Sequence, residues 1–443
     1  MREPSNPVTP LHSAARAMTI TSPRTVLALA LLLPAAACGG EGGNGEPGAG
    51  PLVEARDTVG DTLVVRVVSG SAWESDASLV PELEIGVLDG DEAYMFGQIR
   101  SLAVAPDGTI YAMDAQIPAL RVYLPDGSHR GTWGRAGGGP GEFGQPDGGL
   151  AVLSDGRVAV RDPGNARMQI YAPDGQSLDT WPVIPGGFNS SNAMHVGRGD
   201  TLLTPLVMDL TVDVAEWRQG LQRVSPHGEI VDTLPVPDTG YERPRLEARV
   251  ENSVSINSVP YSPGEHVTWH PDGFFIHGIS RRYAFTLLDP DGPVRVEREV
   301  ELFPVTSGEK AEEEARATRD LRFTDPNWRW DGPAIPDLKP AFDGFFTGED
   351  GRIWVYRQGP GVEREDPNYD PSDPESVEDR WRDTPLFDVF EADGTFLGTV
   401  RAPLDFSRYP RPVFRGDQVW AVTRDDLGVQ RIVRYRVVRD ATG

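Results

Sequence analysis

Short apolar runs alternate with Asp-Gly pairs along most of the chain. In the first clear unit, strand-like runs at 101–106, 109–114, 120–125 and 130–134 are separated at two points by Asp107-Gly108 and Asp126-Gly127. Alternation with period two is typical of half-buried strands, and Asp-Gly is a strong hairpin signal because glycine adopts positive φ without steric cost. The pattern therefore predicts four short strands joined by tight turns.

The unit recurs along the chain. Its two Asp-Gly pairs lie 19 residues apart, as do those at 155 and 174 and at 272 and 291, whereas the pairs at 350 and 393 lie 43 residues apart. A third unit is degenerate, and a sixth begins near Gly416-Asp417. Six units of four strands and roughly 40–45 residues are typical of a β-propeller. The sequence therefore predicts an all-β fold, a six-bladed propeller with four-stranded antiparallel blades over residues 83–443.

The last unit lacks a recognisable fourth strand at the C-terminus. A strand-like segment, Leu83-Glu-Ile-Gly86, stands in the matching place before the first unit. We expect it to close the last blade as its outer strand, which would remove an exposed sheet edge. Residues 61–82 precede it and contain the apolar run 62–68, which predicts one extra N-terminal strand.

Three insertions lengthen the repeat, at 205–220, 304–340 and 359–384. All three fall in loops that join strand two to strand three or one blade to the next, so they share one face of the propeller. Within the second insertion, Thr306 and Glu309 have the spacing of a capping box. This spacing predicts one short helix of about three turns over 310–321, lying over the channel mouth.

Blades one and two carry a family resemblance. Residues 134–143, the Asn165–Arg167 segment and Gln169-Ile-Tyr171 resemble an NHL-type repeat, and the chain is similar to bacterial six-bladed β-propeller lipoproteins of that group over about 83–441. In blades three to six the similarity is only architectural. The resemblance implies the fold, and the insertion-bearing face as the usual binding face, rather than an activity. Arg167 is expected to bridge to a carboxylate of a neighbouring blade.

The N-terminus has the pattern of an export signal. Twelve apolar residues at 26–37 follow Arg24, which is too short to span a bilayer but typical of a signal-peptide core. The segment Pro34–Cys38 resembles a bacterial lipobox. We therefore expect residues 1–37 to be a signal peptide, with translation starting at Met1 or Met18, Cys38 to be lipidated, and 38–60 to be a flexible tether. Gly39 after the cysteine resembles the signal for the outer membrane, on its periplasmic or surface side.

Composition excludes several classes of protein. The chain has 443 residues, one cysteine, a net charge of −25, 49 glycines and 40 prolines. A disulfide scaffold or cysteine-based metal site needs more cysteines. A nucleic-acid binder needs a basic face. A long helical bundle would not tolerate so much glycine and proline.

Alignment of the units on their turns suggests a ring of polar residues at the channel mouth. Strand-one starts contribute Arg100, Asn192, Glu265 and Asp343, with His266 beside them, and strand-two ends contribute Arg281, Arg357 and Arg424. Such a mixed-charge ring could bind a polar ligand. The alternative is that these charges pair with one another around a wet channel.

A metal site is weakly supported. His266 and His270 would face the same side of a strand, but zinc normally takes three or four ligands and no histidine trio is spaced for it. The acidic stretch 363–373 could hold calcium, although it lacks EF-hand spacing and reads better as a solvated loop. We predict no metal and no cofactor, with calcium as the alternative.

The sequence favours a binding module over an enzyme. No Gly-x-Ser-x-Gly elbow and no phosphate-binding loop is present. We expect a membrane-anchored, extracytoplasmic module that binds an unknown small molecule or envelope protein, and no nucleic acid. One alternative is a propeller hydrolase or lyase, lactonase-like or amidating-lyase-like, that acts on a small polar substrate with or without a metal. Another is a structural scaffold in the cell envelope.

Overall fold

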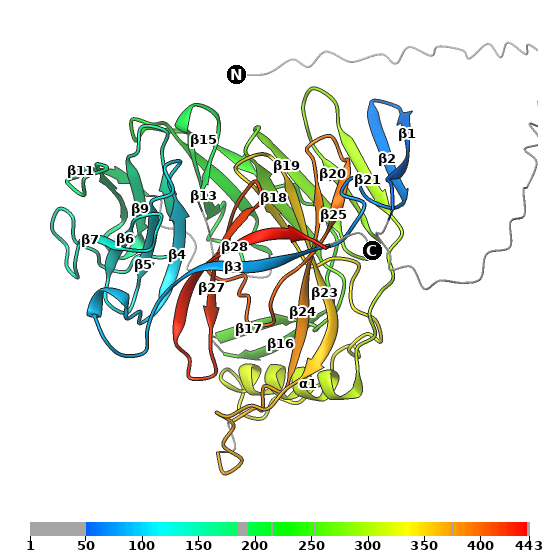
Figure 1. Cartoon of the computed structure of the whole chain (residues 1–443). Helices are drawn as coiled ribbons and strands as arrows, with labels where there is room; N and C mark the ends of the chain where they lie inside the picture. Colours follow the sequence, from blue (N-terminus) through cyan, green and yellow to red (C-terminus); the bar gives the residue numbers. More distant parts are fainter. Residues whose placement is uncertain (1–49, 184–193, 214–215, 252, 374–375, 441–443) are drawn as a thin grey trace, which may run out of the picture. The chain divides into compact units, whose positions relative to one another are not determined.

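Antiparallel sheets dominate the protein in a computed structural model that describes residues 50–183, 194–213, 216–251, 253–373 and 376–440 (Figure 1). The first predicted unit is confirmed as a four-stranded sheet of β4 (Ile99–Val104), β5 (Ile110–Asp114), β6 (Ala119–Tyr123) and β7 (His129–Trp133). Its Asp-Gly turns form as expected, with φ of 87° at Gly108 and 85° at Gly127, a region that disfavours a side chain. The local sequence is therefore sufficient to specify the tight turns of this sheet.

Two more sheets repeat this meander. One contains β8 (Leu150–Val152), β9 (Val158–Asp162), β10 (Arg167–Tyr171) and β11 (Ser177–Pro182). The other contains β12 (His195–Val196), β13 (Leu202–Val207), β14 (Gln219–Val224) and β15 (Ile230–Pro235). Short 3-10 turns in the described segments include η1 (Glu92–Tyr94), η2 (Pro163–Asn165) and η3 (Arg198–Asp200).

A six-stranded sheet includes the extra N-terminal strand. Its order is β1 (Val53–Val59), β2 (Thr62–Ser69), β21 (Val294–Arg298), β20 (Ala284–Leu287), β19 (Phe274–Ile279) and β18 (Glu265–His270). The strand predicted at 62–68 therefore exists, and it pairs in parallel with β21. Residues 53–59, expected as tether, instead form β1, because β2 offers a free edge and buries Val65 and Val67 against the blade.

An eight-stranded sheet joins two units through β3. Its order is β22 (Phe345–Thr347), β23 (Ile353–Glu363), β24 (Trp381–Phe390), β25 (Phe396–Arg401), β3 (Ala77–Ile85), β28 (Gln430–Arg439), β27 (Gln418–Arg424) and β26 (Val413–Arg415). The predicted pairing of the N-terminal strand with the last unit is confirmed, with Leu83 opposite Arg434. The strand begins earlier than expected, at Ala77, where it also pairs with Val400 of β25.

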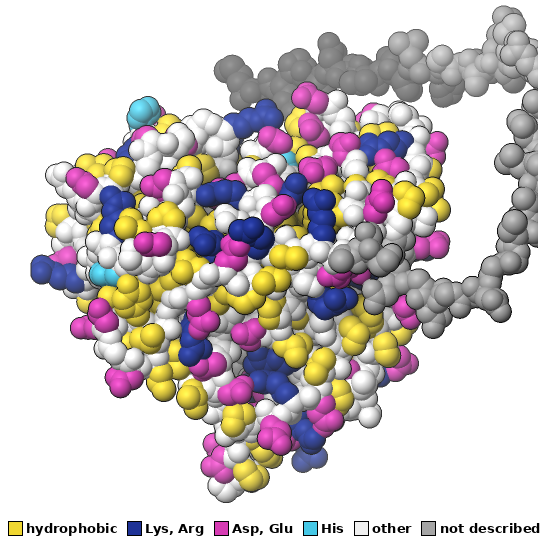
Figure 2. Space-filling view, in the orientation of Figure 1, with side chains coloured by type: hydrophobic (Ala, Val, Ile, Leu, Met, Phe, Trp, Pro, Cys, Tyr) yellow, Lys and Arg dark blue, Asp and Glu magenta, His cyan; other side chains and the backbone are white. Residues whose placement is uncertain are grey.

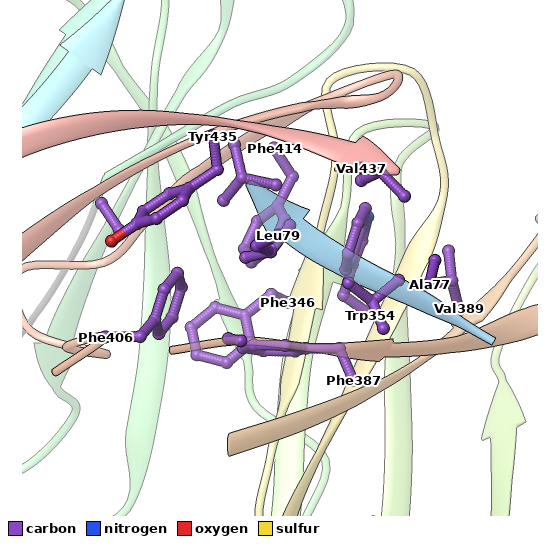
Figure 3. Close-up of a cluster of buried hydrophobic side chains, with 14 of the residues drawn as sticks. Ala77, Leu79, Phe346, Trp354, Phe387, Val389, Phe406, Phe414, Tyr435 and Val437 are labelled. Carbon is purple, nitrogen blue, oxygen red and sulfur yellow. The ribbon is translucent and has the colours of Figure 1, made fainter. Parts of the chain in front are cut away.

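An aromatic cluster fills the interior beneath β3. Ala77 and Leu79 of β3 pack over Trp354, Phe387 and Phe414, as Figure 3 shows. Ring centroids of Trp354 and Phe414 lie 4.6 Å apart. A strand contributed from the far end of the chain therefore covers much of the core of the last two units.

The first strands of the sheets face one another around a central cavity. Strand β4 contacts β8 and β26, β8 contacts β12, and β18 contacts β22. Residues from all of these first strands or their ends line the same cavity. Sheets arranged in this way, with their first strands inward, form a β-propeller.

The insertion at 304–340 adds the one α-helix among the described residues, and it packs on an unpredicted hairpin that lies outside the three predicted insertions. Helix α1 (Ser307–Arg322) begins at the N-cap Thr306, and both hydrogen bonds of the predicted capping box with Glu309 are present. At 16 residues it exceeds the expected three turns. It packs on the hairpin of β16 (Arg245–Val250) and β17 (Ser253–Ser258) through Leu321 and Leu246. No helix in the described segments is long and apolar enough to cross a membrane.

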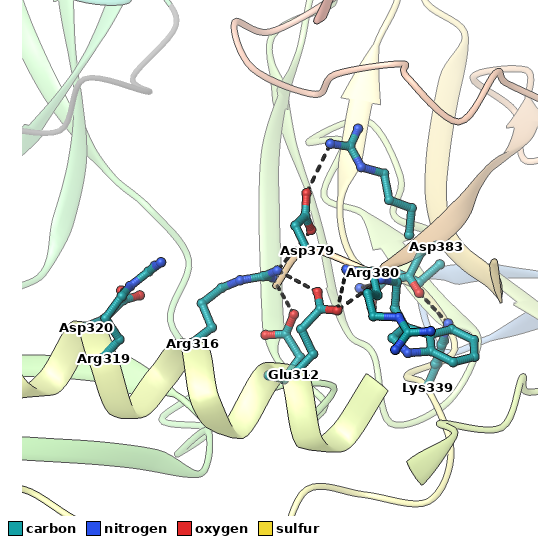
Figure 4. Close-up of polar contacts among 12 residues, drawn as sticks. Glu312, Arg316, Arg319, Asp320, Lys339, Asp379, Arg380 and Asp383 are labelled. Atoms are coloured by element: carbon teal, nitrogen blue, oxygen red, sulfur yellow. Dashed lines mark hydrogen bonds and ion pairs between the residues drawn. The ribbon is translucent and has the colours of Figure 1, made fainter. Parts of the chain in front are cut away.

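Polar contacts hold α1 to the long β23–β24 hairpin (Figure 4). The Glu312 carboxylate accepts hydrogen bonds from the backbone N–H groups of Arg380 and Trp381, at 2.8 and 3.0 Å. Arg316 donates to Asp379 at 3.2 Å. The insertions at 304–340 and 359–384 therefore lie against each other, at the lower edge of Figure 1.

Candidate functional site

A pocket of about 510 Å³ opens on the face that carries the insertions. We call it the insertion-face pocket. Glu265 and His266 enter it from the start of β18, Asp343 from just before β22, and Arg408 and Arg411 from just before β26. Because first strands begin at this face, residues far apart in sequence meet here. Glu265, His266 and Asp343 are thus brought together as the sequence suggested.

A second cavity of about 360 Å³ opens on the opposite face, among the strand one–two turns. We call it the turn-face channel. Ser101, Ser154 and Glu349 lie along it. His195, Trp269 and Arg411 line both cavities. These three side chains therefore mark the junction at which the two cavities approach each other, in the middle of the propeller.

Glu265 is held by three hydrogen bonds. Its Oε1 accepts from the backbone N–H and the hydroxyl of Thr239, at 2.9 and 2.7 Å, and lies 2.6 Å from His277 Nε2. Burial alone would raise the pKa of Glu265, but the bonds from Thr239 and His277 hold it below the usual value. Glu265 is therefore an ionised carboxylate whose Oε1 already has its partners.

Asp343 and Arg408 form an ion pair across the pocket wall. Arg408 Nη1 lies 3.1 Å from Asp343 Oδ2, and the guanidinium sits 4.1 Å from the ring centroid of Tyr356. The alternative interpretation of the polar ring, in which its charges pair with one another, therefore holds for Asp343 and Arg408. Both acids of the pocket have polar partners within the protein.

His266 is a neutral imidazole in the pocket. Its Nε2 lies 3.2 Å from Ser280 Oγ, and its ring packs against Phe342 at 5.4 Å. Burial in these surroundings lowers the pKa of His266 to about 4. His270, on the same side of β18, is fully buried, with Nε2 2.8 Å from the Gly351 carbonyl. Among the described residues, no group of three or more His, Cys, Asp or Glu side chains is arranged to hold a metal.

The other predicted site residues lie apart from this pocket. Arg100 is a bulge residue in β4, where the pairing skips from Ile99 to Ser101. Arg281 is exposed and lies 5.5 Å from the Tyr241 ring. Arg357 is only 8% exposed and donates to the Glu301 carbonyl at 2.8 Å, inside the protein. Asn192 and Cys38 lie outside the described residues.

A third pocket, of about 520 Å³, lies between α1 and the β23–β24 hairpin and contains the remaining site prediction, Arg424. Glu313 and Arg316 of α1 line it, and it reaches Arg408, which it shares with the insertion-face pocket. Helix α1 therefore borders this third pocket, which adjoins the insertion-face pocket at Arg408. Burial raises the pKa of Glu313.

Two carboxylates at strand-two ends have a structural role. Asp114 accepts the backbone N–H groups of Gly97 and Gln98 at 2.9 and 3.0 Å, and Asp162 does the same for the loop at 144–145. Each acid thus ties down the loop that enters its own blade.

The expected role of Arg167 is wrong. Its guanidinium donates to backbone carbonyls of the loop 138–142, including that of Glu142 at 3.0 Å, rather than to a carboxylate of another blade. The physical reason is local. The glycine-rich loop turns its carbonyls toward the arginine, with Gly141 at a φ of 73°. A planar guanidinium has enough donors to satisfy several of them.

Sequence reasoning missed the residues at the cavity junction. Arg411 stands between Pro410 and Pro412, and nothing in the repeat singles it out. Its only sequence signal is its position three residues after Arg408, just before β26, the first strand of the last unit. The alignment of the units on their turns marks neither Trp269 nor His195.

Comparisons identify the fold but not the activity. Neither family models nor curated protein sequences match the chain. Among solved structures, a member of the DUF4221 family from Bacteroides vulgatus superposes with a TM-score of 0.50 at 10% identity, over 83% of this chain and 99% of that one. What is shared is the fold. The NHL resemblance and the lipid anchor stay predictions.

Two enzymes are similar at a lower level. Virginiamycin B lyase from Staphylococcus aureus gives a TM-score of 0.40 at 10% identity, over 82% of this chain and 100% of that one. A gluconolactonase from Xanthomonas campestris gives 0.35 at 13% identity, over 87% and 98%. Similarities this weak carry no argument about chemistry.

The low pKa of His266 predicts acid sensitivity. The unfolded chain has an ordinary histidine pKa and binds a proton below about pH 6.5, whereas folded His266 stays neutral down to about pH 4, so stability falls as pH drops through this window. Replacing His266 by glutamine should reduce the stability lost between pH 7 and pH 5 by up to about 2 kcal/mol. Urea unfolding at both pH values measures the difference. The same change at exposed His227 is the control, and equal pH dependence in the two variants would contradict the prediction.

Proposed function

We propose that this protein is a lipid-anchored, extracytoplasmic β-propeller of six blades that binds a small polar ligand in the insertion-face pocket. The export and anchoring part rests on the apolar segment before Cys38 and its lipobox-like residues. The six-blade count rests on the repeat and on six meanders, the last of them completed by β3.

One observation carries the ligand-binding part. The chain brings Glu265, Asp343 and Arg411 from separate parts of the sequence to one concave pocket of about 510 Å³. A concave site of several hundred cubic ångströms with a few convergent polar groups is the usual form of a small-molecule site. On the face in Figure 2, acidic and basic side chains are interspersed, so no single-sign surface there favours a highly charged macromolecule.

A pocket-filling variant tests this function. Val267 is a half-buried residue that lines the insertion-face pocket, and Val267→Trp is expected to occupy it. The probes are sugars, amino acids, dicarboxylates, nucleosides and phosphate esters, screened by thermal unfolding. A class that binds should raise the Tm of the parent protein by a few degrees and have no effect on Val267→Trp.

The matched control is Val231→Trp, at a valine 57% exposed on the outer strand β15. This variant should respond to probes as the parent protein does. A screen in which no class binds, or in which Val267→Trp responds like the control, would contradict the proposed function.

Catalysis on a small polar substrate is the second candidate. It is favoured by His266, a neutral imidazole that faces the pocket and could accept a proton. Any probe that binds should therefore be followed by NMR for chemical change. Turnover that is lost in His266→Gln while binding persists would favour the enzyme, and an unchanged probe would favour the binding module.

A further inference from the structure

Arg411 occupies the junction between the insertion-face pocket and the turn-face channel. Within the described part of the chain, its side chain has one hydrogen-bond partner. Nη2 donates to Thr268 Oγ1 at 3.3 Å, and the guanidinium lies 5.0 Å from the centroid of the Phe346 ring. A guanidinium has five N–H donors, so Arg411 keeps donors for a ligand in the cavities that it lines.

No carboxylate of the described residues lies within 4.0 Å of the Arg411 guanidinium. Its neighbours in sequence differ in this respect, because Arg408 pairs with Asp343 and Arg415 pairs with Glu349. The stretch 184–193, which leads to His195, contains no Asp or Glu. Burial lowers the pKa of Arg411 to about 10, and no carboxylate among the described residues offsets this effect. Such a group is costly for the folded protein unless something else pairs with it.

The other two polar groups at the junction are His195 and Trp269. His195 is a neutral imidazole, with one donor and one acceptor nitrogen, because burial lowers its pKa to about 3. Trp269 is 7% exposed, lines both cavities and has no hydrogen-bond partner for its indole Nε1–H among the described residues. The acceptors nearby are already engaged, since Glu265 binds Thr239 and His277, and Asp343 binds Arg408. A ligand that reaches the junction therefore meets the positive charge and the remaining N–H donors of Arg411.

We infer that the ligand of the insertion-face pocket carries an oxyanion group, a carboxylate or a phosphate, and that this group binds the Arg411 guanidinium. This inference rests on the proposed ligand-binding function. A guanidinium recognises both oxyanions through two parallel N–H···O bonds. Trp269 forms part of the apolar wall beside this group. The remainder of the ligand lies toward the insertion face, between Glu265 and Asp343.

A purely structural role for Arg411 would have a different signature. Loss of an arginine that stabilises the fold through Phe346 and Thr268 lowers the Tm of the ligand-free protein. Loss of an unpaired, desolvated charge kept for binding leaves that Tm unchanged or raises it. The Tm of Arg411→Gln without added anion separates the two roles.

The binding test compares matched probes on the purified full-length protein. Succinate and inorganic phosphate represent the two oxyanions, and succinamide has the shape of succinate without its charge. Ionic strength is held constant with sodium chloride. Succinate or phosphate is expected to raise the Tm by roughly 2–5 °C at saturating concentration and to change tryptophan fluorescence, whereas succinamide should do neither. The more effective anion identifies the chemical source of the group.

Variants then locate the interaction. Arg411→Gln should weaken anion affinity by at least about tenfold, the usual result of losing a charge-assisted hydrogen bond, and Arg411→Lys should fall between. The control is Arg130→Gln on the exposed surface of β7, which should bind like the parent protein.

Three results would overturn the inference. They are an anion affinity unchanged in Arg411→Gln, succinamide binding as well as succinate, and no effect of either anion on the parent protein. If any of these results is found while a neutral probe binds the parent protein but not Val267→Trp, the oxyanion inference fails and the proposed ligand-binding function stands. A pocket screen with no hits at all would remove both.

Discussion

A chain that begins at Val87 is expected to lose cooperative folding, because it lacks β3. This strand pairs with β28 along most of its length and buries Ala77, Leu79 and Ile85. Their transfer to water and the loss of the ladder remove more than about 5 kcal/mol, which approaches the whole stability of a typical domain. The exposed edge of β28 would then favour aggregation. Circular dichroism, gel filtration and urea unfolding report the outcome.

The matched control is a chain that begins at Ser71. It lacks the β1–β2 hairpin, and with it the buried side chain of Val65, but it retains β3. We expect this chain to remain folded with a lower urea midpoint and a single transition. If the chain from Val87 unfolds with the midpoint of the protein that begins at Gly50, β3 does not close the last sheet in the way described.

Replacing Asp388 by alanine is expected to destabilise the protein by about 3–5 kcal/mol. Asp388 is fully buried, 2.7 Å from Arg298 Nη1 and 3.7 Å from Arg357 Nη1, and accepts a hydrogen bond from Thr399 at 2.7 Å. Burial alone would raise the pKa of Asp388, but Arg298 and Arg357 hold it below the usual value, so the carboxylate is charged at neutral pH. Its removal leaves two largely buried guanidinium groups without their counter-charge.

Two further variants test this explanation by urea unfolding. Asp388→Asn keeps a hydrogen-bonding oxygen without the charge and should cost less than alanine. The side chain of Asp57 is 62% exposed and pairs with Arg66. Asp57→Ala should therefore lower the free energy of unfolding by no more than about 1 kcal/mol. An Asp388→Ala variant as stable as Asp57→Ala would show that the buried charges are compensated in another way.

Site residues predicted from the starts of first strands were placed correctly more often than those predicted from the ends of second strands. Glu265, His266 and Asp343 meet in one pocket because first strands of adjacent units begin at the same face, which alignment on the turns could anticipate. Arg357 lies one residue from pocket-lining positions on β23, yet its side chain points inward to Asp388. Successive side chains on a strand face opposite sides, so an error of one residue moves a prediction from pocket to core.

The sequence by itself determined the repeating meander, the closing strand and the helix. Each rests on local chemistry: Asp-Gly turns that require positive φ, alternation with period two, and the capping box of Thr306 and Glu309. Only the tertiary structure decided the cavity junction. Trp269 lies on β18 and Arg411 lies just before β26, far apart in the chain. Whether the arginine meets a carboxylate or a cavity depends on how the blades are oriented relative to one another. That geometry is set by the packing of whole sheets, for which no short stretch of sequence holds the information.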